Sequence, residues 1–220
     1  MARSPQEFVA ELDRENRLAL ARIESASIAG DAAEDLTIPK LLLLALKNEL
    51  EATECAAHWI PSTAHVRAKL GFARQAGDEA RHYALIQKRL AELGVDTTAH
   101  DPFKEGRSPL LTFLSALEDT VARVAAGQFT REALALVRNE QFIRYAEATG
   151  DSATARLYRE IIQPDETHHH ELGRSLLLEL ATTEDAQQRA LAASQKTLQM
   201  AEELQEIARL KKGISRAPGC

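Results

Sequence analysis

The sequence predicts an all-α protein, built as an antiparallel four-helix bundle with an additional helix at each end. The composition is rich in Ala, Leu, Glu and Arg, with 45% hydrophobic and only 5% aromatic residues, and this mixture favours helix. Apolar residues recur at helical spacing over long stretches that few Gly or Pro residues interrupt. Two tight turns and one long connection join the four central stretches, as expected for two helical hairpins.

The first half of the chain predicts three amphipathic helices, bounded by residues that start or stop a helix. Thr37 is a suitable N-cap for the second helix, because its side chain can accept a free backbone N–H. Pro61 is expected to end that helix, and Ser62 or Thr63 to cap the third. The three helices are placed at residues 5–29, at about 38–60, and from that cap to about 93.

The second half opens with a crossover loop at residues 94–108, where Gly and Pro residues gather. Ser108 followed by Pro109 predicts an N-cap and the first position of a new helix. That helix is expected to continue to a tight turn at residues 150–152, with a kink near Gly127. The remaining helices are placed from that turn to about 180, and at about 184–212.

A chain of 220 residues is long enough to bury one large core, so residues 1–220 are expected to form a single domain. The bundle is expected over about residues 37–180. The flanking helices, at about 5–29 and 184–212, can pack on the bundle or form the contact of a homodimer. The net charge of −6 argues against binding to nucleic acid or to a membrane through overall charge.

The cysteines and the apolar runs bear on the compartment. Cys55 and Cys220 do not indicate a disulfide framework, which favours a reducing, cytoplasmic location. The first residues lack the apolar core of a signal peptide. The longest apolar run, Leu41 to Leu46, is far too short to cross a bilayer, so no contact with a membrane interior is expected.

The pattern Asp-Glu-x-x-His occurs twice, at residues 78–82 and 165–169, on the second helix of each predicted hairpin. A Glu and a His three residues apart lie on one face of a helix, so both can reach one metal ion. Three histidines in a row follow the second Glu, and the middle one repeats the spacing of the first pattern. The two patterns predict the halves of a carboxylate-bridged dinuclear metal site, with the ligands Glu79, His82, Glu166 and His169.

A site of this kind takes one further Glu from each of the other two helices. The helix before the first pattern offers Glu49, Glu51 and Glu54. Glu49 lies on the apolar stripe of the helix, between Ala45 and Ala52, whereas Glu51 points about 200° away by helical geometry. Glu49 is therefore the expected ligand.

The helix before the second pattern offers Glu132, Glu140 and Glu147, and its apolar stripe, which includes Ala133 and Val137, touches the first two. Height along the bundle separates them. Counted from the turn near Gly150, Glu166 faces about residue 134, and at 1.5 Å per residue Glu140 would miss that level by about 9 Å. Glu132 is therefore the expected ligand, and Glu140 remains the less favoured alternative.

Each pattern begins with an aspartate, Asp78 or Asp165, turned about 100° from the Glu that follows it. Each aspartate can therefore face the neighbouring helix and accept the free ring N–H of the other pattern's histidine, which orients the ring. We expect hydrogen bonds from His82 to Asp165 and from His169 to Asp78. Arg81 is expected to pair with one of the two aspartates.

Burying four carboxylates and two imidazoles in an apolar interior is very unfavourable without a counter-charge. Two divalent cations would supply four positive charges against the four negative ones. This balance favours a metal site over a metal-free polar core.

The two patterns, together with Lys47-Asn48-Glu49, resemble those of the ferritin-like diiron-carboxylate superfamily, and are similar to rubrerythrin-type proteins and tRNA-modifying diiron hydroxylases. The resemblance covers about residues 37–180. It implies two iron ions, or one manganese and one iron, with Glu79 and Glu166 as bridging, catalytic carboxylates. The six ligands that it implies are Glu49, Glu79, His82, Glu132, Glu166 and His169.

The resemblance implies an oxidoreductase that activates O₂ to oxidise a small organic substrate or a modified nucleoside, such as one in tRNA, with electrons from an external donor. One alternative is iron handling, as a ferroxidase, a storage subunit or a peroxide scavenger. The other is a non-catalytic helical scaffold.

Overall fold

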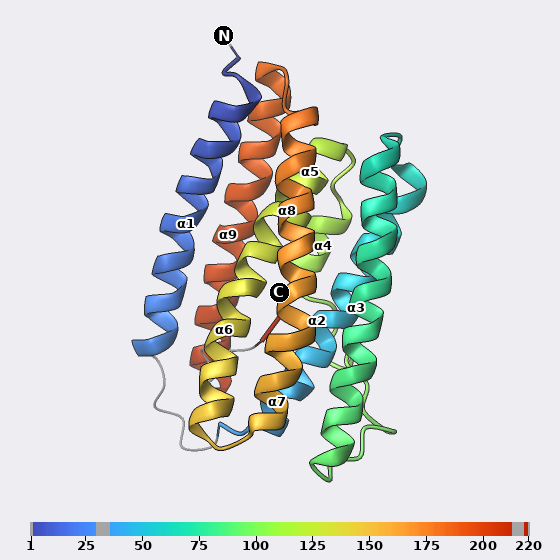
Figure 1. The fold of residues 1–220 in the computed structure, drawn as a ribbon, viewed down its shortest axis with the longest axis vertical. Coiled ribbons are helices and arrows are strands. Elements are labelled where there is room, and N and C mark those ends of the chain that lie inside the picture. Colours follow the sequence, from blue (N-terminus) through green and yellow to red (C-terminus); the bar gives the residue numbers. More distant parts are fainter. Residues whose placement is uncertain (1, 30–35, 213–217, 220) are drawn as a thin grey trace.

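The computed structural model of the chain describes residues 2–29, 36–212 and 218–219. Within these residues every regular element is a helix, so the all-α prediction is confirmed. The long helices lie side by side along the longest axis of the molecule (Figure 1).

The first three helices lie close to their predicted positions, and Thr37 caps the second as expected. The predicted caps of the third helix, Ser62 and Thr63, are wrong. The second helix continues through Ser62, and the third is capped by His65, whose Nδ1 accepts the N–H of Ala68 at 3.3 Å. The helices are α1 (Pro5–Ala29), α2 (Ile38–Ser62) and α3 (Val66–Glu92).

The single helix expected between Pro109 and the turn at 150–152 is divided into several pieces. Its start is as predicted, because the Ser108 side chain accepts the N–H of Leu111. The helix breaks before Asp119, which caps a new one by accepting the N–H of Ala122 at 3.1 Å. The pieces are α4 (Pro109–Ser115), α5 (Thr120–Val124), η1 (Ala125–Arg131) and α6 (Glu132–Ala148).

The helix expected after the turn also has an internal irregularity. It comprises α7 (Ser152–Leu157), η2 (Tyr158–Ile162) and α8 (Gln163–Leu180), and α9 (Glu184–Lys212) follows. Both η segments are π-helical. In η1 the N–H of Glu132 donates to the carbonyl of Gly127, and in η2 that of Gln163 donates to Tyr158. Each bond spans five residues instead of four, and such irregularities are frequent at functional sites.

Two hairpins form the centre of the fold: α2 packs along α3, and α6 packs along α7 and α8. The η1 segment lies close to α8, where a Cβ added at Gly173 would be 2.7 Å from backbone atoms of η1. Helices α1 and α9 pack on the outside of α6 and η1. A closed set of hydrogen bonds joins Asn16, Thr130 and Ser194, and so fastens η1 to both outer helices.

The interior of the two hairpins has three layers. One apolar cluster includes Trp59 and Phe129, and a second includes Leu42 and Phe142. Along α2 and α3, and along the continuous stretches η1–α6 and η2–α8, the predicted ligands lie between residues of the first cluster and residues of the second. The ligands therefore form a polar layer between two apolar ones.

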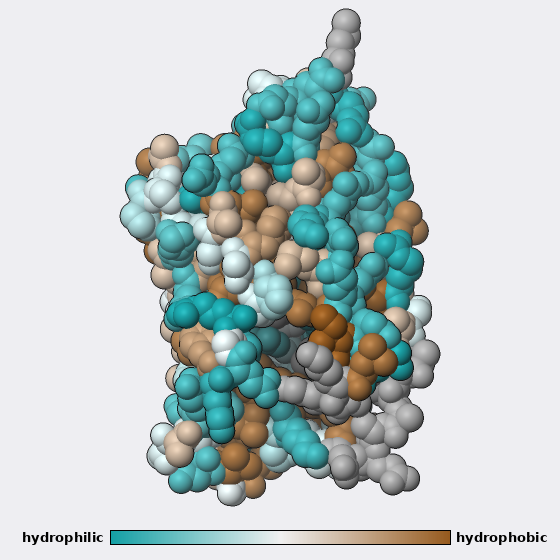
Figure 2. Space-filling model, turned by 180° about the vertical axis from the view of Figure 1, so that it is seen from behind, coloured by the Kyte–Doolittle hydropathy of each residue, from teal (hydrophilic) through white to brown (hydrophobic). Residues whose placement is uncertain are grey.

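The surface seen from behind mixes hydrophilic and hydrophobic residues (Figure 2). Among the described residues, none of the helices has the length and apolar character needed to cross a membrane.

Candidate metal centre

The structure brings all six predicted ligands together in the polar layer. Each is at most 2% exposed. They form two groups of potential metal ligands, in which the donor atoms lie within 4.8 Å of one another. The groups are Glu49, Glu79, His82 and Glu166, and Glu79, Glu132, Glu166 and His169.

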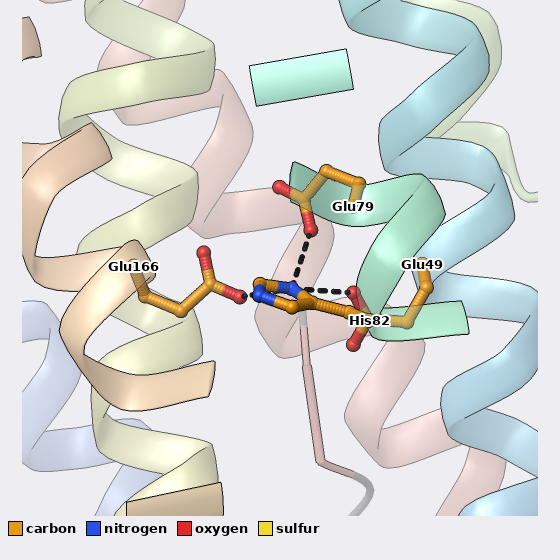
Figure 3. Close-up of side chains that lie close together, drawn as sticks. All are labelled: Glu49, Glu79, His82 and Glu166. Carbon is orange, nitrogen blue, oxygen red and sulfur yellow. Dashed lines mark hydrogen bonds and ion pairs between the residues drawn. The ribbon is translucent and has the colours of Figure 1, made fainter. Parts of the chain in front are cut away.

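The first group surrounds the ring of His82 (Figure 3). Its Nδ1 lies 3.3 Å from Glu79 Oε2, 3.4 Å from Glu49 Oε2 and 3.7 Å from Glu166 Oε1. These oxygens come from α2, α3 and α8, so three helices converge on one nitrogen atom.

The second group repeats this arrangement around His169. Its Nδ1 lies 3.2 Å from Glu166 Oε2 and 3.7 Å from Glu79 Oε1. Glu132, the first residue of α6, completes the group and is fully buried. Glu79 and Glu166 thus present one oxygen to each histidine, which is the placement that bridging carboxylates need.

The far side of each imidazole faces the predicted aspartate. His82 Nε2 lies 3.0 Å from Asp165 Oδ2, and His169 Nε2 lies 3.2 Å from Asp78 Oδ2. Because a carboxylate only accepts hydrogen bonds, each Nε2 carries the hydrogen and donates it. Arg81 pairs with Asp165, so the two predicted hydrogen bonds and the predicted ion pair are all confirmed. Sequence reasoning missed the matching pair on the other side, from Arg74 to Asp78.

The donor set fits a metal ion at each histidine. With Nε2 protonated, a neutral imidazole directs the lone pair of Nδ1 at the carboxylate oxygens, which is repulsive unless a proton or a cation lies between them. Donor atoms about 2.1 Å from one ion and at right angles to each other lie about 3 Å apart. The observed Nδ1-to-oxygen distances of 3.2 and 3.3 Å to the nearest carboxylates are close to this spacing.

The pKa values show how strongly the polar layer requires positive charge. Burial raises the pKa of Glu49 to about 7, and those of Glu132 and Glu166 well above the usual carboxyl range. Burial would also raise the pKa of Glu79, but the hydrogen bond from His82 and the imidazole charges lower it to about 2. Burial would lower the pKa of His82, but Glu49 and Glu79 raise it to about 12. Without a cation, the layer retains protons to limit its negative charge.

The alternative ligand Glu140 is excluded by its position. Its side chain is 43% exposed and pairs with Arg144 on the surface of α6. Glu51 is buried, but its oxygens accept the N–H and hydroxyl of Ser108 instead of facing the layer. Of these two residues of α6, Glu132 therefore lies in the layer, as the height argument expected.

The apolar stripe of α6 did not distinguish Glu132 from Glu140 because this helix has two apolar faces. Ala133 and Val137, which belong to the predicted inward stripe, pack on a third apolar cluster, shared with α1 and α9. The face toward the ligands carries Glu132, Ala135 and Asn139, all fully buried.

Sequence reasoning also missed Gln75, which lies one turn before Glu79 on α3. Its Nε2 donates to Glu132 Oε1 at 2.6 Å and is 3.5 Å from Glu79 Oε1. The amide thus links the carboxylates of two helices and orients Glu132. A glutamine four residues before the candidate ligand Glu79, on the same helix face, was the available signal.

The fold and the site together define a helical protein with a buried cluster of carboxylates and imidazoles that could hold metal. A family model described as "Protein of unknown function (DUF455)" matches residues 47–218, so the chain belongs to the DUF455 family. The match includes all six candidate ligands. No curated protein and no solved structure shows significant similarity to the chain.

Proposed function

We propose that the chain is a dinuclear metal protein in which α2, α3, α6 and α8 form a ferritin-like antiparallel four-helix bundle. The observation that carries this proposal is the overlap of the two ligand groups, since Glu79 and Glu166 belong to both. Two ions would share these carboxylates as bridges. The other ligands would divide into Glu49 with His82 on one ion, and Glu132 with His169 on the other.

Charge supports two ions over one. Four ionised carboxylates carry four negative charges, and two divalent cations balance them. A single cation would leave a net negative charge in a layer enclosed by apolar clusters on both sides, which is unfavourable.

The donor chemistry favours iron, or iron with manganese. Each ligand group has three carboxylates and one imidazole, a set rich in oxygen that suits these metals. Structural zinc prefers four ligands in a closed tetrahedral set, usually with thiolates, and the cysteine that the structure describes, Cys55, is not in either group.

We further propose an O₂-dependent oxidase or oxygenase that acts on a small organic molecule or a modified nucleoside. When bound, the metal ions would supply redox chemistry with O₂, and an external donor would provide the electrons. The chain's own residues hold the ions, and Asp78 and Asp165 orient the imidazoles through hydrogen bonds. The apolar clusters keep bulk water from the layer.

The test begins with metal-free protein loaded with Fe(II) under anaerobic conditions. We expect two ions per chain by elemental analysis, and O₂ uptake on exposure to air. The Glu166→Gln variant serves as the control and should take up O₂ no faster than free Fe(II). Two bound ions without O₂ uptake would contradict the redox function but not the proposed metal centre. Formation of a ferric mineral would favour iron storage, and a stable protein that binds no metal would favour a scaffold.

The Asp165→Asn variant is expected to bind metal about 10- to 100-fold more weakly. The substitution preserves size, but an asparagine is a weaker acceptor for His82 Nε2–H, and the ring loses its orienting charge. Competition with a chromogenic chelator measures the affinity. Asp101→Asn is a matched control, because Asp101 accepts a backbone N–H within the crossover loop and belongs to neither ligand group. Equal affinities of the two variants would show that Asp165 does not orient the ligand.

A further inference from the structure

A short segment far along the chain reaches the metal centre. Pro218 and Gly219 are both buried, and one hydrogen bond ties each of them to a helix. The side-chain amide of Asn48, on α2, donates to the carbonyl of Pro218 at 2.9 Å. The N–H of Gly219 donates to Oδ1 of Asn139, on α6, at 2.7 Å.

Both asparagines adjoin the ligand layer. Asn48 directly precedes the ligand Glu49, and Asn139 lies two turns after the ligand Glu132 on the same face of α6. The segment therefore spans from one ligand-bearing helix to another. Figure 1 shows this end of the trace at mid-length of the helices.

The segment approaches Glu49 itself. A Cβ added at Gly219 would lie 3.4 Å from Glu49 Oε1 and 3.3 Å from Asn48 Cβ. Glu49 Oε1 is buried and has no hydrogen-bond partner among the described residues. Gly219 also has φ of +82°, a conformation that favours glycine. The backbone conformation thus favours glycine here, and an added Cβ would lie in tight contact with Asn48.

The segment occupies a gap between helices. Helix α2 packs closely along α3, and α6 along α8, whereas α2 and α6 make little direct contact with each other. On the other sides of the layer, neighbouring helices pack on each other directly. On the α2–α6 side, the backbone of Pro218–Gly219 lies between the helices.

We propose that Pro218–Gly219 is a plug that closes the α2–α6 side of the metal centre. When this plug is displaced, metal ions enter and leave the layer past Glu49. The inference rests on the metal centre proposed above. Among the described residues, two hydrogen bonds to side chains hold the plug, whereas α2, α3, α6 and α8 are helices with their own backbone hydrogen bonds. We therefore expect that displacing this segment opens the layer with less disruption than displacing a helix.

The test is the rate at which a chelator removes metal from the loaded, full-length chain. In Gly219→Val the added side chain meets Glu49 and Asn48, so the plug should be expelled and removal should quicken at least about tenfold, a factor equivalent to about 1.4 kcal/mol. Metal stoichiometry should stay the same. Gly94→Val is the matched control, because Gly94 has φ of +78° but open space around its Cβ position.

A milder variant tests the plug even if Gly219→Val does not fold. Asn48→Ala removes the hydrogen bond to Pro218, and should quicken metal removal about fivefold, as expected for one hydrogen bond. If a chelator removes metal from both variants at the wild-type rate, the proposal of the plug is wrong, whereas the proposal of the metal centre is unaffected. An equal increase in the rate of metal removal from Gly94→Val would also overturn the plug.

Hydrogen exchange of the metal-free proteins separates failure of the plug from failure of the metal centre. Backbone amides of α2 near Asn48 and of α6 near Asn139 should exchange faster in Gly219→Val than in Gly94→Val. This result supports the plug even if the wild-type chain proves to bind no metal. Equal exchange in these two helices would overturn it.

Discussion

The Glu166→Gln variant is expected to lose both metal ions, whereas Glu49→Gln is expected to lose one. Glu166 belongs to both ligand groups, and Glu49 belongs to the His82 group alone. Glutamine keeps the size of the side chain but removes its charge, so the packing of the polar layer is preserved. Metal affinity should fall by more than the factor of about 10 to 100 that is typical of losing an outer hydrogen-bond partner. Elemental analysis after dialysis against a weak chelator measures the stoichiometry.

Two controls accompany this series. Glu51→Gln changes a buried glutamate of the same helix that lies outside both groups and accepts hydrogen bonds from Ser108. It should keep both ions. On α6, Glu132→Gln should lose one ion and the exposed Glu140→Gln should lose none. Two ions in Glu166→Gln would contradict the bridging role, and loss of metal in Glu140→Gln would contradict the ligand assignment.

Metal loading is expected to raise the melting temperature by about 10 °C. A ligand that binds only the folded state adds about 4 kcal/mol at a thousand times its dissociation constant, and a chain of this size gains about 2–4 °C per kcal/mol. The increase should be larger at pH 8 than at pH 5, because protons compete with metal ions for the layer. Differential scanning fluorimetry with and without metal measures both effects.

The pH dependence follows from the raised pKa values of the metal-free layer. The pKa of Glu49 is about 7 in the folded protein, above the ordinary value of about 4.5. Its protonation therefore stabilises the metal-free fold fully below pH about 4.5, and this contribution is lost as the pH rises through about 7. His82, with a pKa of about 12, contributes with the same sign. A metal-free protein that becomes more stable from pH 5 to pH 8 would contradict this account.

The residues that gather in the polar layer were largely predictable because helical spacing is a local property. Glu79 with His82, and Glu166 with His169, share a helix face wherever their helices lie. The spacing also set the direction of Asp78 and Asp165, whose hydrogen bonds to the opposite histidines are present. The assignment of these residues as metal ligands stays a prediction that the experiments above test.

The sequence predictions were wrong where one local pattern was compatible with two different structural roles. On α6, the stripe through Ala133 and Val137 belongs to the contact with the outer helices, and only height identified Glu132. The break before α5 was missed because Asp119 can act as a cap or as an ordinary exposed residue. The π segments were missed because no residue type specifies a hydrogen bond over five residues.

The sequence alone determined the all-α class, the approximate helices and the pairing of Glu with His in each pattern, because these depend on spacing within a single helix. Tertiary structure decided which face of α6 points toward the ligands, where η1 and η2 adjust the helices, and how Gln75 joins Glu132. It also decided that Pro218–Gly219 lies beside Glu49. These features depend on contacts between segments distant in the chain, and spacing along one helix carries no information about them.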